Sequence, residues 1–374
     1  MTVMTGFSGN EMLCLALKHF TPGDIVIGNS VHSLGFIGGI TSGFRGVMGG
    51  EITEVTGIIH EGRREATKRI VAEAEKNEAA GISGMTSELR HFQGNIEFIS
   101  VGSCLYHEAG KQRTLEFSTS GDGQELYCLL DAGYVPKQFV FSNVAYSIGV
   151  TGGLLGGLKS MARGEIKEFS DVFNATRHVA LNRIVTEAKA AGGNCVLGIV
   201  TKLKPFQGLH EMVMMGTAAH HDALGGLGQN CATSDLTCVE TWNITRMGLA
   251  PLRLVLGTAV YSLGMVGGLK AALKSFTRGE ISDLTTLIYD AREHAIDIIR
   301  REASSIGADD VIGIKTHIHE LGSLVEFMAI GTAVKRVPNL STVTPTLPPQ
   351  AVMRDKETWI SGEYQGLGAD DDND

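Results

Sequence analysis

The chain has 374 residues, of which 43% are hydrophobic and 20% charged, and it carries a formal net charge of −9. This composition is typical of a globular protein with a sizeable core, divided into two or three domains of ordinary size. The acidic balance argues against a general nucleic-acid-binding protein, which needs a basic face to release counterions. No run of 18 apolar residues and no signal-peptide pattern is present, so we expect no transmembrane segment and a cytoplasmic location.

Six cysteines are scattered along the chain, and none forms a C-x-x-C pair. This is far below the cysteine density of a small disulfide-stapled domain. We therefore expect reduced thiols, most of them packed in the interior.

The stretch SLGFIGG, at residues 33–39, recurs as SIGVTGG from Ser147 and as SLGMVGG from Ser262. Around it, residues 33–104 align without gaps with residues 147–218 and 262–333. A period of this length far exceeds the roughly 20–50 residues of a solenoid repeat. The chain is therefore predicted to contain three copies of one small domain.

Polar, Gly- and Ser-rich stretches separate the copies, and the residues after Arg336 are rich in proline and end in GADDDND. Such an end cannot bury enough apolar surface to fold alone, so we expect a disordered acidic tail that can bind a protein partner. The expected divisions are unit 1 at 1–110, a linker at 111–124, unit 2 at 125–220, a linker at 221–235, unit 3 at 236–336 and the tail at 337–374.

Each copy has the same expected order of elements. Residues 138–146 read as a strand because of their aromatic and β-branched content. A glycine-rich connection follows, then a long helix over about 165–191, and two strands, which in the third copy span 310–319 and 324–334. The predicted fold is α+β, with three tandem two-layer β-α-β-β units, each a small antiparallel sheet packed with one long helix.

The long helix shows one apolar stripe at a spacing of three and four residues. A glutamate opens the helix in every copy, which suits the positive end of its dipole. In the first copy the stripe consists of Ile52, Val55, Ile59, Ala66, Ile70 and Ala74.

The glycines of the repeated stretch lie four residues apart, so a helical form would place them on one bare face. Such a face allows a neighbouring backbone to approach closely. We interpret it as a packing surface between units, made by Gly35, Gly39, Gly149, Gly153, Gly264 and Gly268.

An arginine interrupts the apolar stripe in each copy, at Arg63, Arg177 and Arg292. A buried charge needs a partner. We expect a structural ion pair with the glutamate of the last strand, and the candidates are Glu97, Glu211 and Glu326. Binding of an anion or carboxylate ligand by the arginine is the alternative.

These residues resemble the YbjQ-like family of small bacterial proteins. The resemblance rests on the S-x-G-x-x-x-G entry, the G-E-I helix start and the third-copy run AREHAIDIIRREASSIGADDVIGI, which ends in EFMAIGTAV. Copies one and two depart from it, since EAAGISGM replaces the GADDVIGI run in the first. The resemblance implies a compact α+β unit, cyclic homo-oligomers that are commonly pentamers, and a family label of heavy-metal binding.

A metal site common to the copies would require its ligands to recur at the repeat period. They do not recur: Cys104, for example, falls on Ala218 and Ala333. His317 and His319 alternate onto one face of a strand and are the remaining metal candidates. We expect no cofactor, with a metal ion as the alternative.

No catalytic motif is present either: the sequence lacks a G-x-S-x-G elbow, a Walker loop and a Rossmann fingerprint. We therefore expect no catalytic residues and a non-enzymatic assembly or binding protein that associates with itself. The alternatives are heavy-metal binding and a small-anion or small-molecule site at a helix N-terminus or between subunits.

Overall fold

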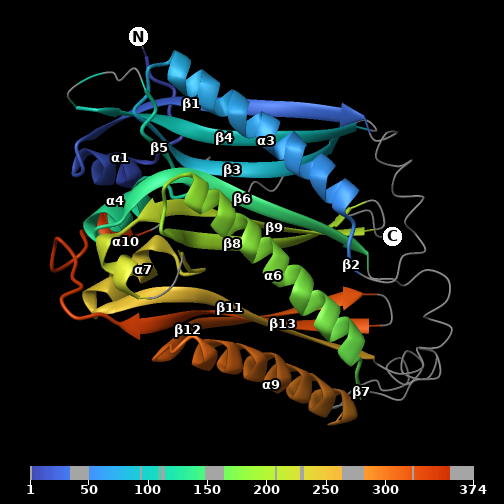
Figure 1. Ribbon diagram of the computed structural model, residues 1–374. Coiled ribbons are helices and arrows are strands. Elements are labelled where there is room, and N and C mark those ends of the chain that lie inside the picture. The colour runs from blue at the N-terminus through green and yellow to red at the C-terminus, as the bar shows by residue number, and fades with distance from the viewer. Residues whose placement is uncertain are drawn as a thin grey trace.

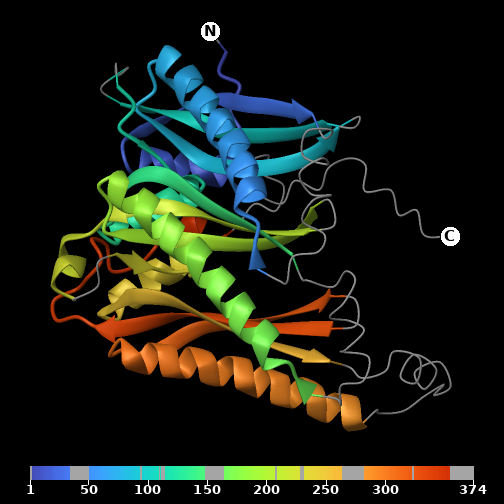
Figure 2. The same ribbon diagram turned by 45° about the vertical axis from the view of Figure 1, so that its right-hand side comes forward.

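The computed structural model describes residues 2–33, 50–92, 95–108, 110, 114–147, 164–206, 209–227, 231–262, 282–321 and 324–353. It consists of three mainly antiparallel sheets stacked one on another, each with a long helix alongside (Figures 1 and 2). The expected α+β class and the three repeated units are confirmed. The six close-packing glycines expected from the sequence lie outside the described residues.

The three units repeat one order of elements. The first unit contains α1 (Gly9–Ala16), β1 (Phe20–Ser33), β2 (Gly50–Glu51), α3 (Thr53–Lys76), β3 (Gly81–Phe92) and β4 (Asn95–His107). The second contains β5 (Phe117–Ser118), α4 (Gly123–Asp131), β6 (Val135–Ser147), β7 (Gly164–Glu165), α6 (Lys167–Ala190), β8 (Cys195–Phe206), β9 (Leu209–His220) and the 3-10 helix η1 (Asp222–Gly226). The third contains β10 (Ala232–Thr233), α7 (Cys238–Arg246), β11 (Leu249–Ser262), α9 (Ser282–Ser305), β12 (Asp310–Leu321) and β13 (Leu324–Arg336), and α10 (Pro349–Val352) follows it.

The short helices that open each unit were not among the predicted elements, although their caps are visible in the sequence. Ser8 and Glu11 form a reciprocal capping box at α1, and Thr237 and Glu240 form another at α7. Asp122 caps α4 through its side chain. Each cap satisfies backbone N–H groups that the first helical turn leaves without a partner.

The long helices pack as their apolar stripes predict. The six stripe residues of the first copy are at most 3% exposed. The next strand of each unit is bulged at a glycine with positive φ, namely Gly84, Gly198 or Gly313. A left-handed residue at a bulge favours glycine, which explains this glycine in all three copies.

Neighbouring units exchange strands. The sheet orders are β1-β4-β3-β5, then β2-β6-β9-β8-β10, then β7-β11-β13-β12. The two-residue strands β2 and β7, which precede α3 and α6, therefore pair with the first long strand of the following unit. In return, β5 and β10 pair with a strand of the preceding unit.

The cores also cross the unit boundaries. Val26, Ile82 and Met85 of the first sheet share one apolar cluster with Phe139 and Phe141 of the second sheet. A second cluster joins α6 and the second sheet to the third sheet. The second sheet, in the middle of the stack, is thus covered on both faces by its neighbours.

Parts of the segments expected to be linkers and a disordered tail instead pack against the folded units. Residues 117–118 and 232–233, within the expected linkers, are the strands β5 and β10. Residues 337–353, the start of the expected disordered tail, lie along α1 and α4 and include α10. Ala351 is buried there, and Gln124 donates a 2.6 Å hydrogen bond to the Met353 carbonyl.

Candidate functional site

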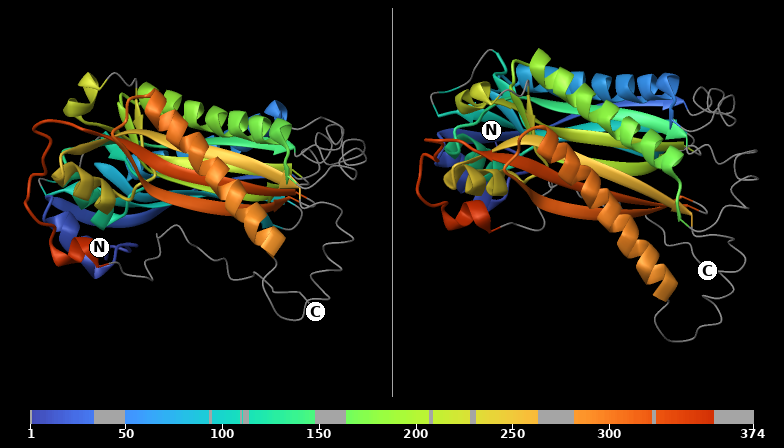
Figure 3. Two further views of the ribbon diagram at one scale, coloured as in Figure 1. Left: turned by 90° about the horizontal axis from the view of Figure 1, so that it is seen from below. Right: turned by 60° about the horizontal axis from the view of Figure 1, so that its bottom comes forward.

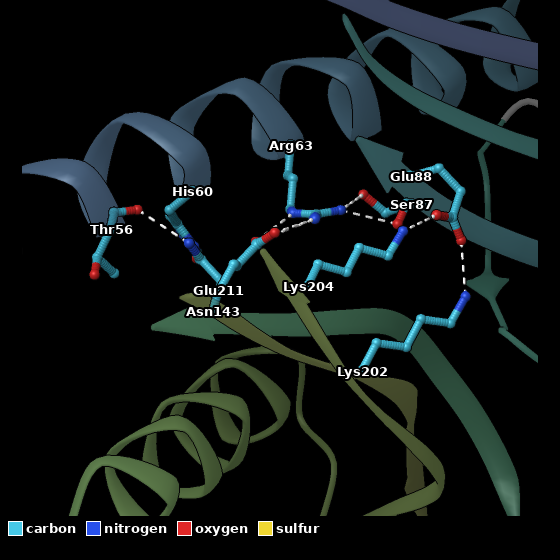
Figure 4. A network of polar contacts seen from close by, with 9 residues as sticks. All are labelled: Thr56, His60, Arg63, Ser87, Glu88, Asn143, Lys202, Lys204 and Glu211. Carbon is cyan, nitrogen blue, oxygen red and sulfur yellow. Dashed lines mark hydrogen bonds and ion pairs between the residues drawn. The ribbon is translucent and has the colours of Figure 1, made fainter. Parts of the chain in front are cut away.

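The junction between the first two units is centred on Arg63, whose side chain is completely buried. Its Nη2 lies 3.0 Å from Glu211 Oε2, and its Nε and Nη2 both donate to Glu211 Oε1 (Figure 4). Its Nη1 donates to the Ser87 carbonyl at 2.9 Å. This bidentate geometry suits the planar guanidinium group and strengthens the ion pair.

The junction between the second and third units repeats the pair. Arg177 Nη2 lies 2.6 Å from Glu326 Oε1, and both side chains are fully buried. The same nitrogen donates to the Tyr146 hydroxyl at 3.0 Å, and the guanidinium carbon lies 4.8 Å from the centre of the Tyr146 ring. Burial acts to lower the pKa of Arg177, but the charges of Glu326 and Tyr146 outweigh it and raise the pKa above its usual value.

The second pair is less completely bonded than the first. Among the described residues, neither Arg177 Nε nor Glu326 Oε2 has a hydrogen-bond partner. His210 and His319 lie near this pair, and burial lowers the pKa of both imidazoles. The neutral form of these histidines is favoured beside the buried arginine.

Both pairs join neighbouring units, whereas the sequence left open which of the three candidate glutamates each arginine would meet. Arg63 of unit 1 pairs with Glu211 of unit 2, and Arg177 of unit 2 pairs with Glu326 of unit 3. The remaining candidates are Glu97, which is half-buried and accepts from Asn29 Nδ2, and Arg292. Arg292 was expected to be buried, and this expectation was wrong. Its side chain is exposed and has no ion-pair partner among the described residues.

Further contacts recur at the same positions of both junctions. The Ala145 amide of unit 2 donates to the Thr56 hydroxyl of α3, and the Val260 amide of unit 3 donates to the Ser170 hydroxyl of α6, each at 2.9 Å. Thr56 and Ser170 were not among the residues expected from the sequence to form contacts. A hydroxyl at the same place in an otherwise apolar helix turn was the signal that could have revealed them.

Glu88 adds an ion-pair network to the first junction (Figure 4). Its two carboxylate oxygens accept from Lys202 at 2.9 Å and from Lys204 at 2.8 Å, and both lysines belong to unit 2. Burial acts to raise the pKa of Glu88, but the hydrogen bonds and charges of the two lysines outweigh it and lower the pKa.

A cavity of about 460 Å³ lies between α3, α6 and β6 at this junction. His60, Asn143, Arg183 and Glu187 line it together with apolar groups. Arg183 is paired with Glu51 at 2.7 Å across the unit boundary. The cavity is a described site that suits the small-molecule alternative.

The described residues do not fit a metal centre. No group of three or more histidine, cysteine or acidic side chains converges in the part of the chain that the structure describes. Burial raises the pKa of Cys14 and Cys231 to about 11 and that of Cys104 to about 12, which favours the thiol over the ligating thiolate. The rings of His317 and His319 stack 6.2 Å apart, but no third ligand of those described joins them.

The sequence model of the YbjQ family matches residues 21–104, 135–222 and 237–337, which is one match for each structural unit. The chain belongs to the YbjQ family. That family is described as "Putative heavy-metal-binding". Most of the chain is therefore made of three tandem YbjQ units, as the resemblance in the sequence implied.

Relatives of this YbjQ chain differ in how many units they match. The encapsulin nanocompartment protein Rv1762c of Mycobacterium tuberculosis is 30% identical over 229 residues, which cover 58% of this chain and 85% of that protein. A UPF0145 protein of Pseudothermotoga lettingae is 40% identical over 85 residues, or 22% of this chain and 80% of the relative. One of Methanoregula boonei is 34% identical over 90 residues, covering 24% and 75% respectively.

None of the helices described for this YbjQ chain combines the length and the apolarity that a membrane crossing requires.

Proposed function

We propose that this YbjQ chain is a non-enzymatic assembly protein that associates with further copies of itself. The observation that carries the proposal is the repeated junction: units 1 and 2, and likewise units 2 and 3, are joined by a buried Arg–Glu pair, exchanged strands and a shared apolar core. One type of contact thus serves twice within the chain. A surface that joins units within a chain is also suited to join units of different chains.

The Mycobacterium tuberculosis relative supports an assembly role, since its name describes a nanocompartment protein. The described residues contain no converging ligand set, so their chemistry supports a packing role better than the heavy-metal role in the family description.

Sedimentation-velocity centrifugation of the full chain tests the proposal. The expected species has a mass that is a multiple of 39.8 kDa. A chain that sediments as a monomer at micromolar concentration would overturn the assembly function. The same sample can be analysed for bound metal, and stoichiometric metal after chelation and dialysis would favour the family description instead.

The cavity at the first junction favours a second candidate function, the binding of a small molecule between units. Native mass spectrometry of the purified chain, followed by denaturation, would reveal a retained small molecule. His60→Ala should then lower its occupancy, whereas substitution of His19, which is exposed elsewhere, should not.

A further inference from the structure

We propose that the outer face of the third unit binds the outer face of the first unit of a second copy, head to tail, and so repeats the two internal junctions. This inference rests on the proposed assembly function and names the partner and the contact residues. The two faces are defined by β1 and β4 at one end of the stack and by α9 and β12 at the other (Figures 1 and 3).

The first unit exposes apolar side chains at positions that are buried in the other two units. Ile27 is 49% exposed and Val31 is 57% exposed. Their equivalents are at most 4% exposed, because the preceding unit covers them; these are Phe141, Ala145, Leu256 and Val260. The outer face of the first sheet therefore lacks the cover that the repeat supplies elsewhere.

The third unit lacks cover on the opposite side. Ile314 of β12 is 45% exposed, whereas its equivalents Met85 and Ile199 are 1% and 3% exposed. Ile318, which lies four residues further along β12, is 44% exposed. Seen from below, α9 crosses the third sheet diagonally without a further unit beyond it (Figure 3).

The charges at the two ends are complementary. Arg292 of α9 stands at the position of the buried Arg63 and Arg177, and it is exposed. Glu97 of β4 stands at the position of the buried Glu211 and Glu326, and it is only half-buried. Each internal pair joins the arginine of one unit to the glutamate of the next. By that rule, Arg292 pairs with Glu97 of the second copy.

The open strand edges are complementary as well. At residues 32–33 β1 pairs with β4 on one edge, and no described strand pairs with it on the other edge, where β2 and β7 pair with β6 and β11 at the equivalent positions. At the other end β12 lacks the short parallel strand that β3 and β8 receive from the following unit, within the described residues. Val3 and Met4, which occupy the repeat positions of β5, are 49% and 70% exposed. These edges would be completed by the second copy.

A second copy is the occupant that satisfies all of these features together. The contact is heterologous, because the two surfaces of one chain differ and each complements the other. Such a contact closes into a ring or continues as a filament, according to the rotation between copies.

Charge reversal tests the inference. Arg292→Glu and Glu97→Arg each place like charges opposite one another, so each should weaken association by about 100-fold or more. The double variant, Arg292→Glu with Glu97→Arg, restores opposite charges and should regain the wild-type mass in sedimentation velocity. Arg64→Glu is the matched control, since Arg64 is an exposed arginine on α3 that faces neither end, and it should leave association unchanged.

Circular dichroism and thermal melting of each variant would establish that it is folded. Val31→Lys provides a second test, because Val31 is exposed in the single chain and its substitution does not disturb the core. If the wild type is oligomeric but Arg292→Glu and Val31→Lys associate as tightly, or the double variant fails to recover, the head-to-tail contact is wrong and the assembly function stands. A monomeric wild type would overturn both.

Discussion

Arg177 in the second unit and Glu326 in the third form a fully buried ion pair, with 2.6 Å between Nη2 and Oε1. The two residues lie 149 positions apart in the chain. The contact therefore holds two consecutive units together. Removing it measures how much the packing between units contributes to the stability of the chain.

Arg177→Met should lower the free energy of unfolding by about 3–5 kcal/mol, because it leaves the Glu326 carboxylate buried without its charge partner. Adding Glu326→Leu should recover most of this loss, since an apolar pair can replace a buried ion pair at little net cost. Urea denaturation measures both effects. Arg64→Met, at an exposed arginine, should change the free energy of unfolding by about 0.5 kcal/mol or less. If Arg177→Met and Arg64→Met lost the same amount of stability, the pairing of Arg177 with Glu326 would be contradicted.

Glu88 should make the stability of the first junction depend on pH. Its pKa is lowered in the folded chain, so its contribution is present above the unfolded value of about 4.3 and is lost as the pH falls through the lower folded value. Glu88→Gln should cost about 1 kcal/mol at pH 7, and the difference from wild type should shrink below pH 4. Urea denaturation at pH 7 and below pH 4 measures the difference in stability between Glu88→Gln and the wild type. Glu75→Gln, at an exposed glutamate, is the control. A loss that does not vary with pH would refute it.

Gly28 lies where β1 passes under α3. A Cβ at this position would meet the Ala66 carbonyl and lie 2.5 Å from the Ile70 nitrogen, both of which are helix backbone. Gly28→Ala should therefore destabilise the chain by about 1–3 kcal/mol. Gly57 is an exposed residue of α3 with open space around it, so Gly57→Ala should stabilise by up to about 1 kcal/mol. Thermal melting that shows the same sign for both substitutions would contradict this account.

All six cysteines are buried, and burial raises the pKa of Cys104 to about 12. At pH 8 the native thiols should react with a chromogenic disulfide reagent roughly 100-fold more slowly than the unfolded chain, because the thiolate is the reactive form. The rate in the presence and absence of denaturant measures this. A cysteine that reacts in the native state at the unfolded rate would show that one of these sites is open.

Asp131 connects three parts of the chain that are distant in sequence. Its buried carboxylate accepts hydrogen bonds from Lys18 at 2.7 Å, Trp242 at 2.8 Å and the Thr344 hydroxyl at 2.7 Å. Asp131→Ala should cost at least about 2 kcal/mol and release the segment around Thr344. Limited proteolysis should then cut this segment faster, whereas Asp222→Ala, at an exposed residue, should leave the digestion pattern unchanged.

The sequence determined the local structure because hydrophobic periodicity and turn residues act over short distances. The stripe from Ile52 to Ala74 predicted α3 and its buried face, and the apolar runs at 310–319 and 324–334, bounded by Gly or polar turns, predicted β12 and β13. The repeat period identified three units of one family. The buried arginines Arg63 and Arg177 stood out because a charge in an apolar stripe requires a partner.

Which glutamate that partner would be was decided only by the tertiary structure. Repetition offers each arginine three equivalent glutamates, and nothing in the local sequence ranks them. The stacking of the sheets places α3 over β6 and α6 over β11, so each arginine reaches the following unit and Arg292 remains exposed. Stacking also brings residues 337–353 against α1 and α4, where long-range contacts such as Thr344 with Asp131 compensate for a composition that predicts disorder. Contacts between distant segments depend on how whole units pack, and that information is not carried by any short stretch of the chain.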